Sequence, residues 1–447
     1  MGFSMGKKKN KGKKNKGRTS GRAFLVTLFV TLSAGALVLF LVMFSGAGKE
    51  PGAQEEIPDI AKVEKEDILE KTVGREPKPQ MAETAESAEE PKPQITEPAA
   101  KELDEEDGGF DESGCIRNEN GRILVKKQET GSDEAILLFA GDILFDDSYT
   151  VMITMRKRGS IRACFSEETL REMEEADIFM LNNEFTYTNR GEPTPGKQFT
   201  FRAKPESAAM LHELGVDIVS LANNHAYDYG EISLLDSLAT LEGIDMPYVG
   251  AGRNLAEASE TVYFHVGNQK IAFISGTQIE RSTPPDTKGA TEDTPGVFRC
   301  MTEPEIYEKV AEAKENSDYV VVYIHWGTEK TDQLDWLQPQ TAKSLAEAGA
   351  DLIIGDHAHV LQPLASVDGV PVIYSLGNYW FNSSTINTCL VKVKVKDGEM
   401  QSFQFLPALQ SGCYTQLLSG AEKDGVLAYM RSISGTVTID AEGYVTF

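Results

Sequence analysis

Cysteine and histidine are both scarce in this sequence, which has five Cys and six His among 447 residues. The cysteines form no C-x-x-C motif and their number is odd, and nothing around them marks a cysteine nucleophile. In an exported protein some of them could pair, but isolated buried thiols are at least as good an interpretation. Any catalytic chemistry is therefore expected to rest on residue types other than cysteine.

Acidic residues are absent from the first 22 positions, which contain nine Lys and Arg. The next 22 residues, 23–44, carry no charge and are rich in Leu, Val and Phe. Because roughly 20 apolar residues span a bilayer and secretory signal cores have only about 7–15, we expect an uncleaved signal anchor rather than a cleaved signal peptide. The tail 1–22 would then stay cytoplasmic, with the rest of the chain outside the cell.

A Lys-rich start is also typical of tails that bind nucleic acid. Directly beside a membrane span it more often sets topology and contacts anionic lipid heads, so we expect a membrane and no nucleic acid as its partner. Residues 45–132 contain a single aromatic residue, Phe110, and are rich in Pro, Glu, Ala and Lys. Such a segment cannot bury enough apolar surface to fold, and we predict a disordered, acidic spacer that precedes a folded domain over 133–447.

Within 133–447, predicted helices alternate with short apolar runs that end in polar residues. A helix in 166–177, for example, has Ser166 as its N-cap and leads to the apolar run 178–181 and then to Glu184. Alternating helices and buried strands predict an α/β fold with a largely parallel core sheet, followed by C-terminal antiparallel strands. Further helices are predicted in 205–215, around 234–241, and in 303–318 and 337–351.

Chemically active side chains follow five of these apolar runs, and they include four of the six histidines. In open α/β sheets the site lies outside the carboxyl ends of the strands. A mixed oxygen and nitrogen ligand set suits Mn, Fe or Zn better than Ca or Mg. Two such ions roughly 3.5–4 Å apart would lower the pKa of a bridging water and clamp an in-line displacement at phosphorus. The predicted metal ligands are Asp142, Glu184, Asn224, His325, His357 and His359.

His225 lies beside the predicted ligand Asn224, where it could protonate a leaving group, with Asp228 orienting its ring. Taken alone, each of these residues could be structural, and a lone histidine usually is. Their concentration at strand ends favours a site. Polar residues in or near the same segments are predicted to contact substrate: Asn223, Arg202, Arg253, Glu329 and Asn378.

The segments AGDILF, NNEF, LANNHAYDYG, VGAGRN, IHWGTE, GADLIIGDHAHVLQP and YSLGNYWF occur in this order. In that order they resemble the CapA family of capsule synthesis proteins, which is associated with poly-gamma-glutamate capsule production. The resemblance covers about 137–407. It implies a four-layer α/β/β/α sandwich similar to the calcineurin-like metallophosphoesterases, with two metals, here preceded by the transmembrane helix and the disordered linker.

The resemblance also implies residue roles. Asp142 matches the aspartate of the first metal motif, but Leu144 stands where that motif has a histidine. Glu184 takes the place of the bridging aspartate. The closing motif departs from the family pattern G-H-H-P-H at Asp356 and Ala358. The remaining correspondences are Asn224 and His225 with the ligand and acid pair, His325 with the lone histidine ligand, and His357 and His359 with the closing His-x-His.

The leading hypothesis is a membrane-anchored, extracytoplasmic protein that supports production or export of poly-gamma-glutamate or another anionic surface polymer. Its metal site would be of the hydrolase type, acting on a phosphoester or an amide bond. One alternative is a non-catalytic subunit that binds the growing polymer beside synthase or export partners. Another is a freestanding extracellular metallophosphoesterase. The scarcity of basic residues near the motifs argues against a metal-free binder of polyglutamate.

Overall fold

Two eight-stranded sheets form the centre of the computed structural model, which describes residues 109–279, 288–301 and 304–447. In the first sheet the strand order is β20-β19-β18-β3-β4-β7-β8, and β17 pairs with β3 outside this path. Strands β3, β4, β7 and β8 are parallel, whereas β18, β19 and β20 continue the sheet in antiparallel pairs. The bounds are β3 Ala135–Ile143, β4 Ile178–Asn183, β7 Ile218–Ser220, β8 Tyr248–Val249, β17 Asn378–Trp380, β18 Ile386–Lys396, β19 Glu399–Ser411 and β20 Tyr414–Leu417.

The second sheet has the order β1-β2-β10-β11-β13-β14-β16-β15. Its centre is parallel, from β11 through β13 and β14 to β16. The bounds are β1 Cys115–Arg117, β2 Ile123–Gln128, β10 Val262–Val266, β11 Gln269–Thr277, β13 Tyr319–His325, β14 Leu352–Asp356, β15 Leu364–Val367 and β16 Val370–Ile373. Three small pairs lie outside both sheets: β5 Thr186–Tyr187 with β6 Arg202–Ala203, β9 Ala251–Gly252 with β12 Gly296–Val297, and β21 Thr438–Ile439 with β22 Val445–Thr446.

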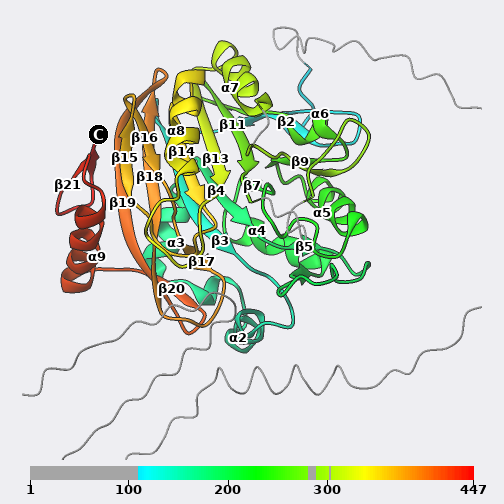
Figure 1. Cartoon of the computed structure of the whole chain (residues 1–447), viewed down its shortest axis with the longest axis horizontal. Coiled ribbons are helices and arrows are strands. Elements are labelled where there is room, and N and C mark those ends of the chain that lie inside the picture. Colours follow the sequence, from blue (N-terminus) through cyan, green and yellow to red (C-terminus); the bar gives the residue numbers. More distant parts are fainter. Residues whose placement is uncertain (1–108, 280–287, 302–303) are drawn as a thin grey trace, which may run out of the picture. The chain divides into compact units, whose positions relative to one another are not determined.

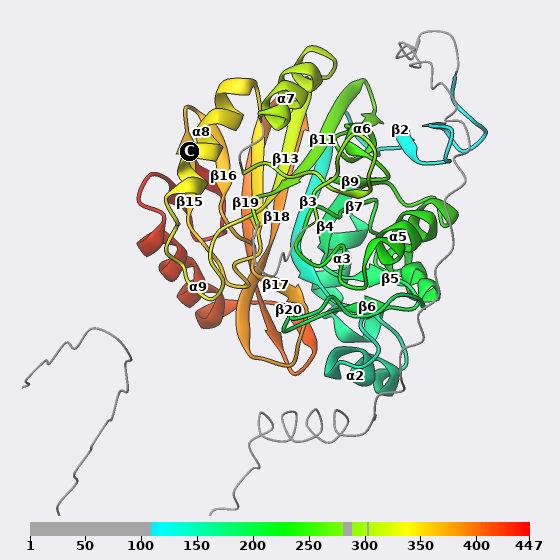
Figure 2. The ribbon, with the colours of Figure 1, turned by 45° about the vertical axis from the view of Figure 1, so that its right-hand side comes forward.

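The central strands are buried on both faces because each sheet lies between the other sheet and a layer of helices. Side chains alternate along a strand, so Leu137 and Phe139 of β3 pack in one core with Val321 and Tyr323 of β13. Leu138, on the opposite face of β3, belongs to a second core on the helical side. The layer order is therefore helices, sheet, sheet, helices, and Figure 2 has α5 and α8 on opposite sides of the strands.

The five predicted helices lie where the apolar pattern indicates, as α3, η3 with α4, α5, α7 and α8, whereas α2, α6 and α9 were not predicted. Ser166 caps α3 by accepting a hydrogen bond from the backbone N–H of Thr169. Helices α7 and α8 cover the outer face of the second sheet, and α9 packs beside β19 (Figure 1). The bounds are α2 Thr150–Arg158, α3 Glu167–Glu174, α4 Ala209–Glu213, α5 Glu231–Gly243, α6 Leu255–Ala258, α7 Glu305–Glu315, α8 Leu337–Ala348 and α9 Gly420–Ile433, with 3-10 turns η2 Arg162–Cys164 and η3 Pro205–Ala208.

The predicted mixed α/β fold is confirmed, with two differences. The parallel strands belong to two sheets, as the four-layer resemblance implies, rather than to the one core sheet that the apolar pattern predicts. Strands β1 and β2 lie within 45–132, where we predicted a disordered linker, and for residues 115–128 that prediction is wrong. Their few apolar side chains, such as Ile123 and Val125, are buried because β2 pairs with β10 at the sheet edge.

The remaining predictions for the N-terminal part, including the anchor at 23–44, lie outside the described residues. Within the part that the structure describes, none of the helices combines the length and apolar character needed to cross a bilayer. All five cysteines are buried free thiols, in agreement with the interpretation as isolated residues.

Candidate metal centre

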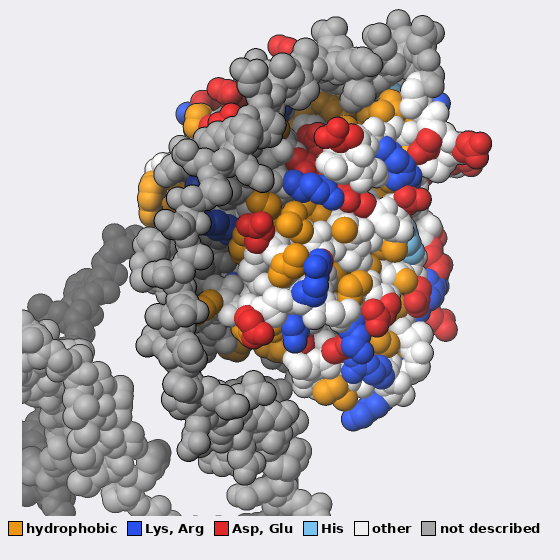
Figure 3. Space-filling model, turned by 90° about the vertical axis from the view of Figure 1, so that its right-hand side faces the viewer, with side chains coloured by type: hydrophobic (Ala, Val, Ile, Leu, Met, Phe, Trp, Pro, Cys, Tyr) orange, Lys and Arg blue, Asp and Glu red, His pale blue; other side chains and the backbone are white. Residues whose placement is uncertain are grey.

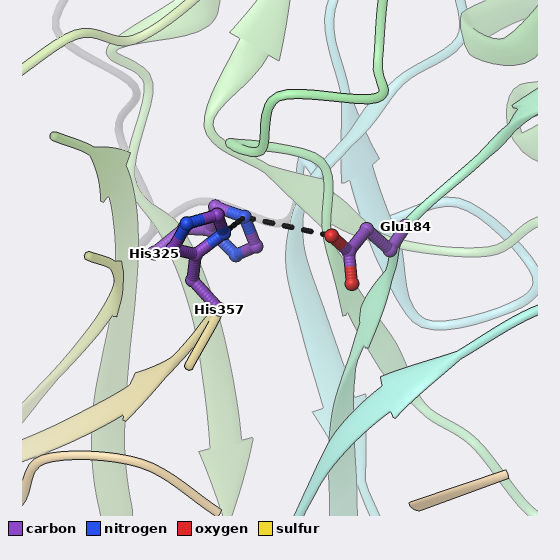
Figure 4. A group of neighbouring side chains, drawn as sticks. All are labelled: Glu184, His325 and His357. Carbon is purple, nitrogen blue, oxygen red and sulfur yellow. Dashed lines mark hydrogen bonds and ion pairs between the residues drawn. The ribbon is translucent and has the colours of Figure 1, made fainter. Parts of the chain in front are cut away.

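The candidate centre lies where carboxyl ends of strands from both sheets meet. Strand β3 supplies Asp142 and the end of β4 supplies Glu184, while β13 and β14 supply His325 and Asp356. Figure 4 shows the carboxylate of Glu184 directed toward the rings of His325 and His357. Three overlapping groups of three residues could each hold a metal ion, because within each group the ligand atoms lie within 4.8 Å of one another. The groups are Glu184 with His325 and His357, Asp142 with Glu184 and His359, and Asp142 with His325 and Asp356.

Glu184 is the residue that most directly indicates a cation-binding site. Its side chain is completely buried, and neither carboxylate oxygen has a hydrogen-bond partner among the described residues. Burial, and then the charge of Asp142, raises the pKa of Glu184 well above its ordinary value. Since buried polar atoms are normally paired, an orphaned carboxylate that belongs to two of the ligand groups fits a residue bridging bound cations.

The ring of His325 is surrounded by other ligand atoms. Its Nε2 lies 2.8 Å from Asn224 Oδ1 and 2.9 Å from His357 Nδ1, and its Nδ1 lies 2.9 Å from Asp356 Oδ1. Burial lowers the pKa of His325 to about 3, which keeps the imidazole neutral as a metal ligand requires. Burial and the charge of Asp142 raise the pKa of Asp356, whose Oδ2 has no partner among the described residues.

Asp142 and His359 form the other side of the centre. His359 Nδ1 lies 3.0 Å from Asp142 Oδ2 and 2.7 Å from Asn378 Oδ1. Burial opposes the charge on this imidazole, but the carboxylates of Glu184 and Asp142 raise the pKa of His359 to about 10. Burial acts against ionisation of Asp142 as well, yet the hydrogen bond and charge of His359 lower the pKa of Asp142 overall.

Unusual backbone geometry supports both histidines of the closing motif. His357 has φ 81° and His359 has φ 57°, values that non-glycine residues rarely adopt. Such conformations persist where surrounding structure enforces them, commonly at binding sites. On the opposite side, a Cβ at Gly141 would lie 1.9 Å from the carbonyl oxygen of Gly377, so glycine permits the close approach that carries β17 beside Asp142.

His225 lies at the edge of the centre and is held by a buried carboxylate. Its Nδ1 is 2.6 Å from Asp228 Oδ2, and its Nε2 is 3.9 Å from Glu184 Oε1. Lys197 donates to Asp228 Oδ1 at 2.6 Å, and the backbone N–H of Phe201 donates to Oδ2, also at 2.6 Å. Burial lowers the pKa of His225, Asp228 opposes that effect, and Lys197 adds to it.

Two Asn residues follow β7, and they have different surroundings. Asn223 donates to Asn182 Oδ1 and to the Asn183 carbonyl, both at 2.9 Å, and accepts from the His225 backbone N–H at 3.0 Å. Its side chain therefore holds the loop rather than facing a free cavity. Asn224 directs its Oδ1 to His325, as the predicted ligand role requires.

The other predicted substrate contacts are spread over different surroundings. The guanidinium of Arg253 forms ion pairs with Glu242 at 2.7 Å and with Glu257, so its charge is already neutralised. The guanidinium group of Arg202 lies over the ring of Tyr229, 4.4 Å from the ring centroid. Asn378 contacts His359 and so lies within the centre, whereas Glu329 lines an adjoining cavity.

Lys197 and the aromatic side chain of Phe201 are parts of the site that the sequence did not reveal. The rings of Phe201 and His225 pack with their centroids 4.3 Å apart. The centroids of the Phe381 and His359 rings are 5.1 Å apart. Phe201 and Phe381 also contact each other, with centroids 5.5 Å apart. No local pattern marks Lys197, because it lies in an irregular stretch. Asn182, which donates to Asp142 at 2.9 Å, could have been found from its place in the NNEF segment.

The chain is similar to known capsule proteins. It is 31% identical over 297 residues to the PGA biosynthesis protein CapA of Bacillus subtilis (strain 168), and the aligned region covers 64% of this chain and 75% of the relative. It is also 31% identical over 238 residues to the capsule biosynthesis protein CapA of Bacillus anthracis, covering 52% of this chain and 57% of that one. The chain thus spans little more than half the length of the second relative.

Among solved structures, the 5'-nucleotidase from Candida albicans SC5314 matches with a TM-score of 0.35 and 12% identity, covering 62% of this chain and 52% of that chain. The family described as bacterial capsule synthesis protein PGA_cap matches residues 136–383, which is more than half of the sequence and contains every predicted metal ligand. The resemblance inferred from the motifs is thereby confirmed, and the chain belongs to the PGA_cap family of bacterial capsule synthesis proteins.

Proposed function

We propose that this protein is a membrane-anchored, extracytoplasmic hydrolase that uses divalent metal ions and acts in the production or export of poly-gamma-glutamate or a related anionic surface polymer. The observation that carries the proposal is the buried carboxylate of Glu184, which has no hydrogen-bond partner among the described residues and lies among three histidines and two further acids. The family and the names of the relatives support the polymer role. The uncharged run 23–44 supports the anchor.

The donor set fits transition metals of the Mn, Fe or Zn type, because imidazole nitrogens are mixed with carboxylate oxygens. Glu184 would bridge two ions, with His325, His357 and Asn224 on one side and Asp142 and His359 on the other. Bound there, divalent cations would lower the pKa of a water and neutralise charge that develops on the scissile group. Asp356 would either join the ligands or orient His325 through its contact with Nδ1.

His225 is the residue placed to handle a proton. With Nδ1–H donating to Asp228, the other nitrogen, Nε2, faces Glu184 and is available to give a proton to a leaving group. Lys197 holds Asp228 in place by donating to Oδ1, the carboxylate oxygen that His225 does not contact. Phe201 shields the His225 ring from water, because Phe201 itself is only 5% exposed and packs against it.

Metal ions would also help the protein to bind an anionic polymer. The chain has a formal net charge of −25, and in Figure 3 acidic and basic side chains are interspersed over one face of the domain. Neither the net charge nor this mixed surface favours the binding of a polyanion. Cations at the centre would supply local positive charge and bridge to carboxylates or phosphates of the substrate.

A non-catalytic polymer-binding subunit is the second candidate. It is favoured by Leu144, which is completely buried in the apolar core at the position where the family's first motif has a histidine. Fewer ligands at one position could leave a centre that binds substrate without turning it over. Asp356 opposes this interpretation, since it adds a carboxylate to the same ligand cluster.

The test is metal content and hydrolysis measured on one preparation of the full-length protein, as wild type, His225→Ala and His357→Ala. Substrates are a phosphodiester, a phosphomonoester and poly-gamma-glutamate. We expect near-stoichiometric transition metal that His357→Ala loses, and turnover of one substrate class that His225→Ala abolishes with its metal retained. Metal without turnover on any substrate would favour the binding subunit. Absence of metal from the wild type, even after loading, would refute both.

A further inference from the structure

A cavity of about 360 Å³ adjoins the metal centre, and His357 is one of its walls. The segment after β13 and the start of α8 form much of the rest, with Gly327, Glu329, Asp335 and Leu337 among the lining residues. A substrate group bound in this cavity would therefore lie beside a residue of the reacting centre. The cavity is a candidate for recognising the part of the substrate next to the scissile bond.

One lining side chain has a hydrogen-bond acceptor for which no described residue supplies a donor. Gln278 lines the cavity and is 3% exposed. Its Nε2 donates to Thr341 Oγ1 at 2.5 Å, while its Oε1 has no hydrogen-bond partner among the described residues. A buried acceptor without a donor costs free energy, and a ligand that carries N–H or O–H groups would remove that cost.

Two carboxylates give the cavity negative charge. Asp335 uses Oδ1 to accept from the backbone N–H groups of Leu337 and Gln338, which fixes it at the start of α8. Glu329 is exposed and forms no hydrogen bond or ion pair within the described part of the chain. The described lining residues include neither Lys nor Arg, so no cation of the lining itself neutralises these acids.

We propose that this cavity binds a protonated primary amine of the substrate, as at the amino end of a γ-linked glutamate chain. An ammonium group has three donors and a positive charge, which match the unpaired Gln278 Oε1 and the carboxylates of Glu329 and Asp335. The adjoining carbonyl and carboxylate groups would lie at the metal centre. This inference rests on the proposed function, and it adds that the protein recognises the amino end of the polymer.

A neutral sugar is the competing ligand, because its hydroxyl groups also donate hydrogen bonds. Trp336 lies between two lining residues and is 73% exposed, which would suit stacking on a sugar ring. The two carboxylates favour a cation instead, since a neutral sugar brings no charge to balance them and the described lining contains no Lys or Arg. An ammonium group also contacts an aromatic face favourably.

Binding of γ-linked triglutamate to metal-loaded full-length protein tests the proposal, measured by calorimetry with the free amine and with the amine acetylated. Acetylation removes the charge and two donors but keeps every carboxylate. Charged hydrogen bonds at a partly exposed site predict roughly five- to tenfold tighter binding of the free amine. Glu329→Gln should reduce this preference to about twofold or less, and Glu399→Gln, an exposed acid on β19 outside the lining, should leave it unchanged.

Equal binding of the two peptides by a protein that holds metal and turns over substrate would overturn the amine subsite and leave the proposed function intact. Loss of the preference in Glu399→Gln as well as in Glu329→Gln would also overturn it, because a diffuse charge effect would then explain the result. Tighter binding of a neutral N-acetylated sugar oligomer that depends on Glu329 would assign the cavity to a sugar and overturn the amine subsite. Failure of the proposed function itself is read separately, from metal content and turnover.

Discussion

Replacing Asp228 with Asn tests the role of His225 in proton transfer. Asp228 is completely buried and accepts three hydrogen bonds, each of 2.6 Å, from His225 Nδ1, the Phe201 backbone N–H and Lys197 Nζ. Asparagine keeps the size of the side chain but has one acceptor oxygen and an amino group. At least one of the three donors therefore loses its acceptor, and His225 loses the charge that orients its ring.

The size of the effect follows from these contacts. A hydrogen bond to a charged group contributes about 1.5–3 kcal/mol. Each 1.36 kcal/mol lost from the transition state slows a reaction about tenfold, so kcat should fall roughly 10- to 100-fold. Burial already lowers the pKa of His225, and Asp228 opposes that effect. Without the carboxylate the acid form loses its proton at lower pH, and the alkaline limb of the pH–rate profile should move to lower pH.

The assay is kcat as a function of pH on the best substrate, with metal content measured in the same samples. Asp397→Asn is the matched control, because Asp397 is an exposed turn residue between β18 and β19. The Asp228→Asn variant should keep its metal, since Asp228 belongs to none of the ligand groups. A kcat within about twofold of wild type, with an unmoved alkaline limb, would refute the proton-transfer role of this pair.

Three further predictions concern stability. The pKa of His359 is raised to about 10 in the metal-free protein, so its stabilising effect is complete below its ordinary value of 6.5 and is lost as pH rises through about 10. The Tm of metal-free protein should therefore fall between these pH values more steeply than that of His359→Ala, and parallel curves would contradict the coupling. Gly141→Ala should lower Tm strongly and reduce metal content, because its Cβ would meet the Gly377 carbonyl oxygen at 1.9 Å; an unchanged Tm would show that β17 can move away freely. Ser166→Ala should cost about 1 kcal/mol in urea unfolding, through loss of the cap to the Thr169 N–H, with metal content unchanged. A cost near zero would mean that water replaces this cap.

The long periodic elements could be predicted from sequence because their patterns are local. The apolar run of β13 and the cap of α3 are examples. The apolar pattern alone could not show that the parallel strands form two sheets, since strands buried on both faces look alike whichever sheet they join. Strand β1 was missed because it has only three residues, and Ile116 becomes a core residue only through pairing with β2.

The site was predictable to the extent that its residues follow apolar strands. Asp142 and His325 lie directly at strand ends, and strand order brings them together. The surroundings of Arg253 could not be predicted, because its ion pairs with α5 and α6 depend on how those helices pack. Lys197 reaches Asp228 only through the path of an irregular segment, for which sequence has no periodic signal.

The most direct test of the central claim is the transition-metal content of full-length wild type and Glu184→Gln, measured by plasma mass spectrometry after loading and desalting. Glutamine has nearly the same size and is neutral, so the folded core should persist while the bridging carboxylate is lost. We expect near-stoichiometric metal in the wild type and loss of at least one ion in the variant. Equal metal content in the two proteins, or none in either, would contradict this expectation.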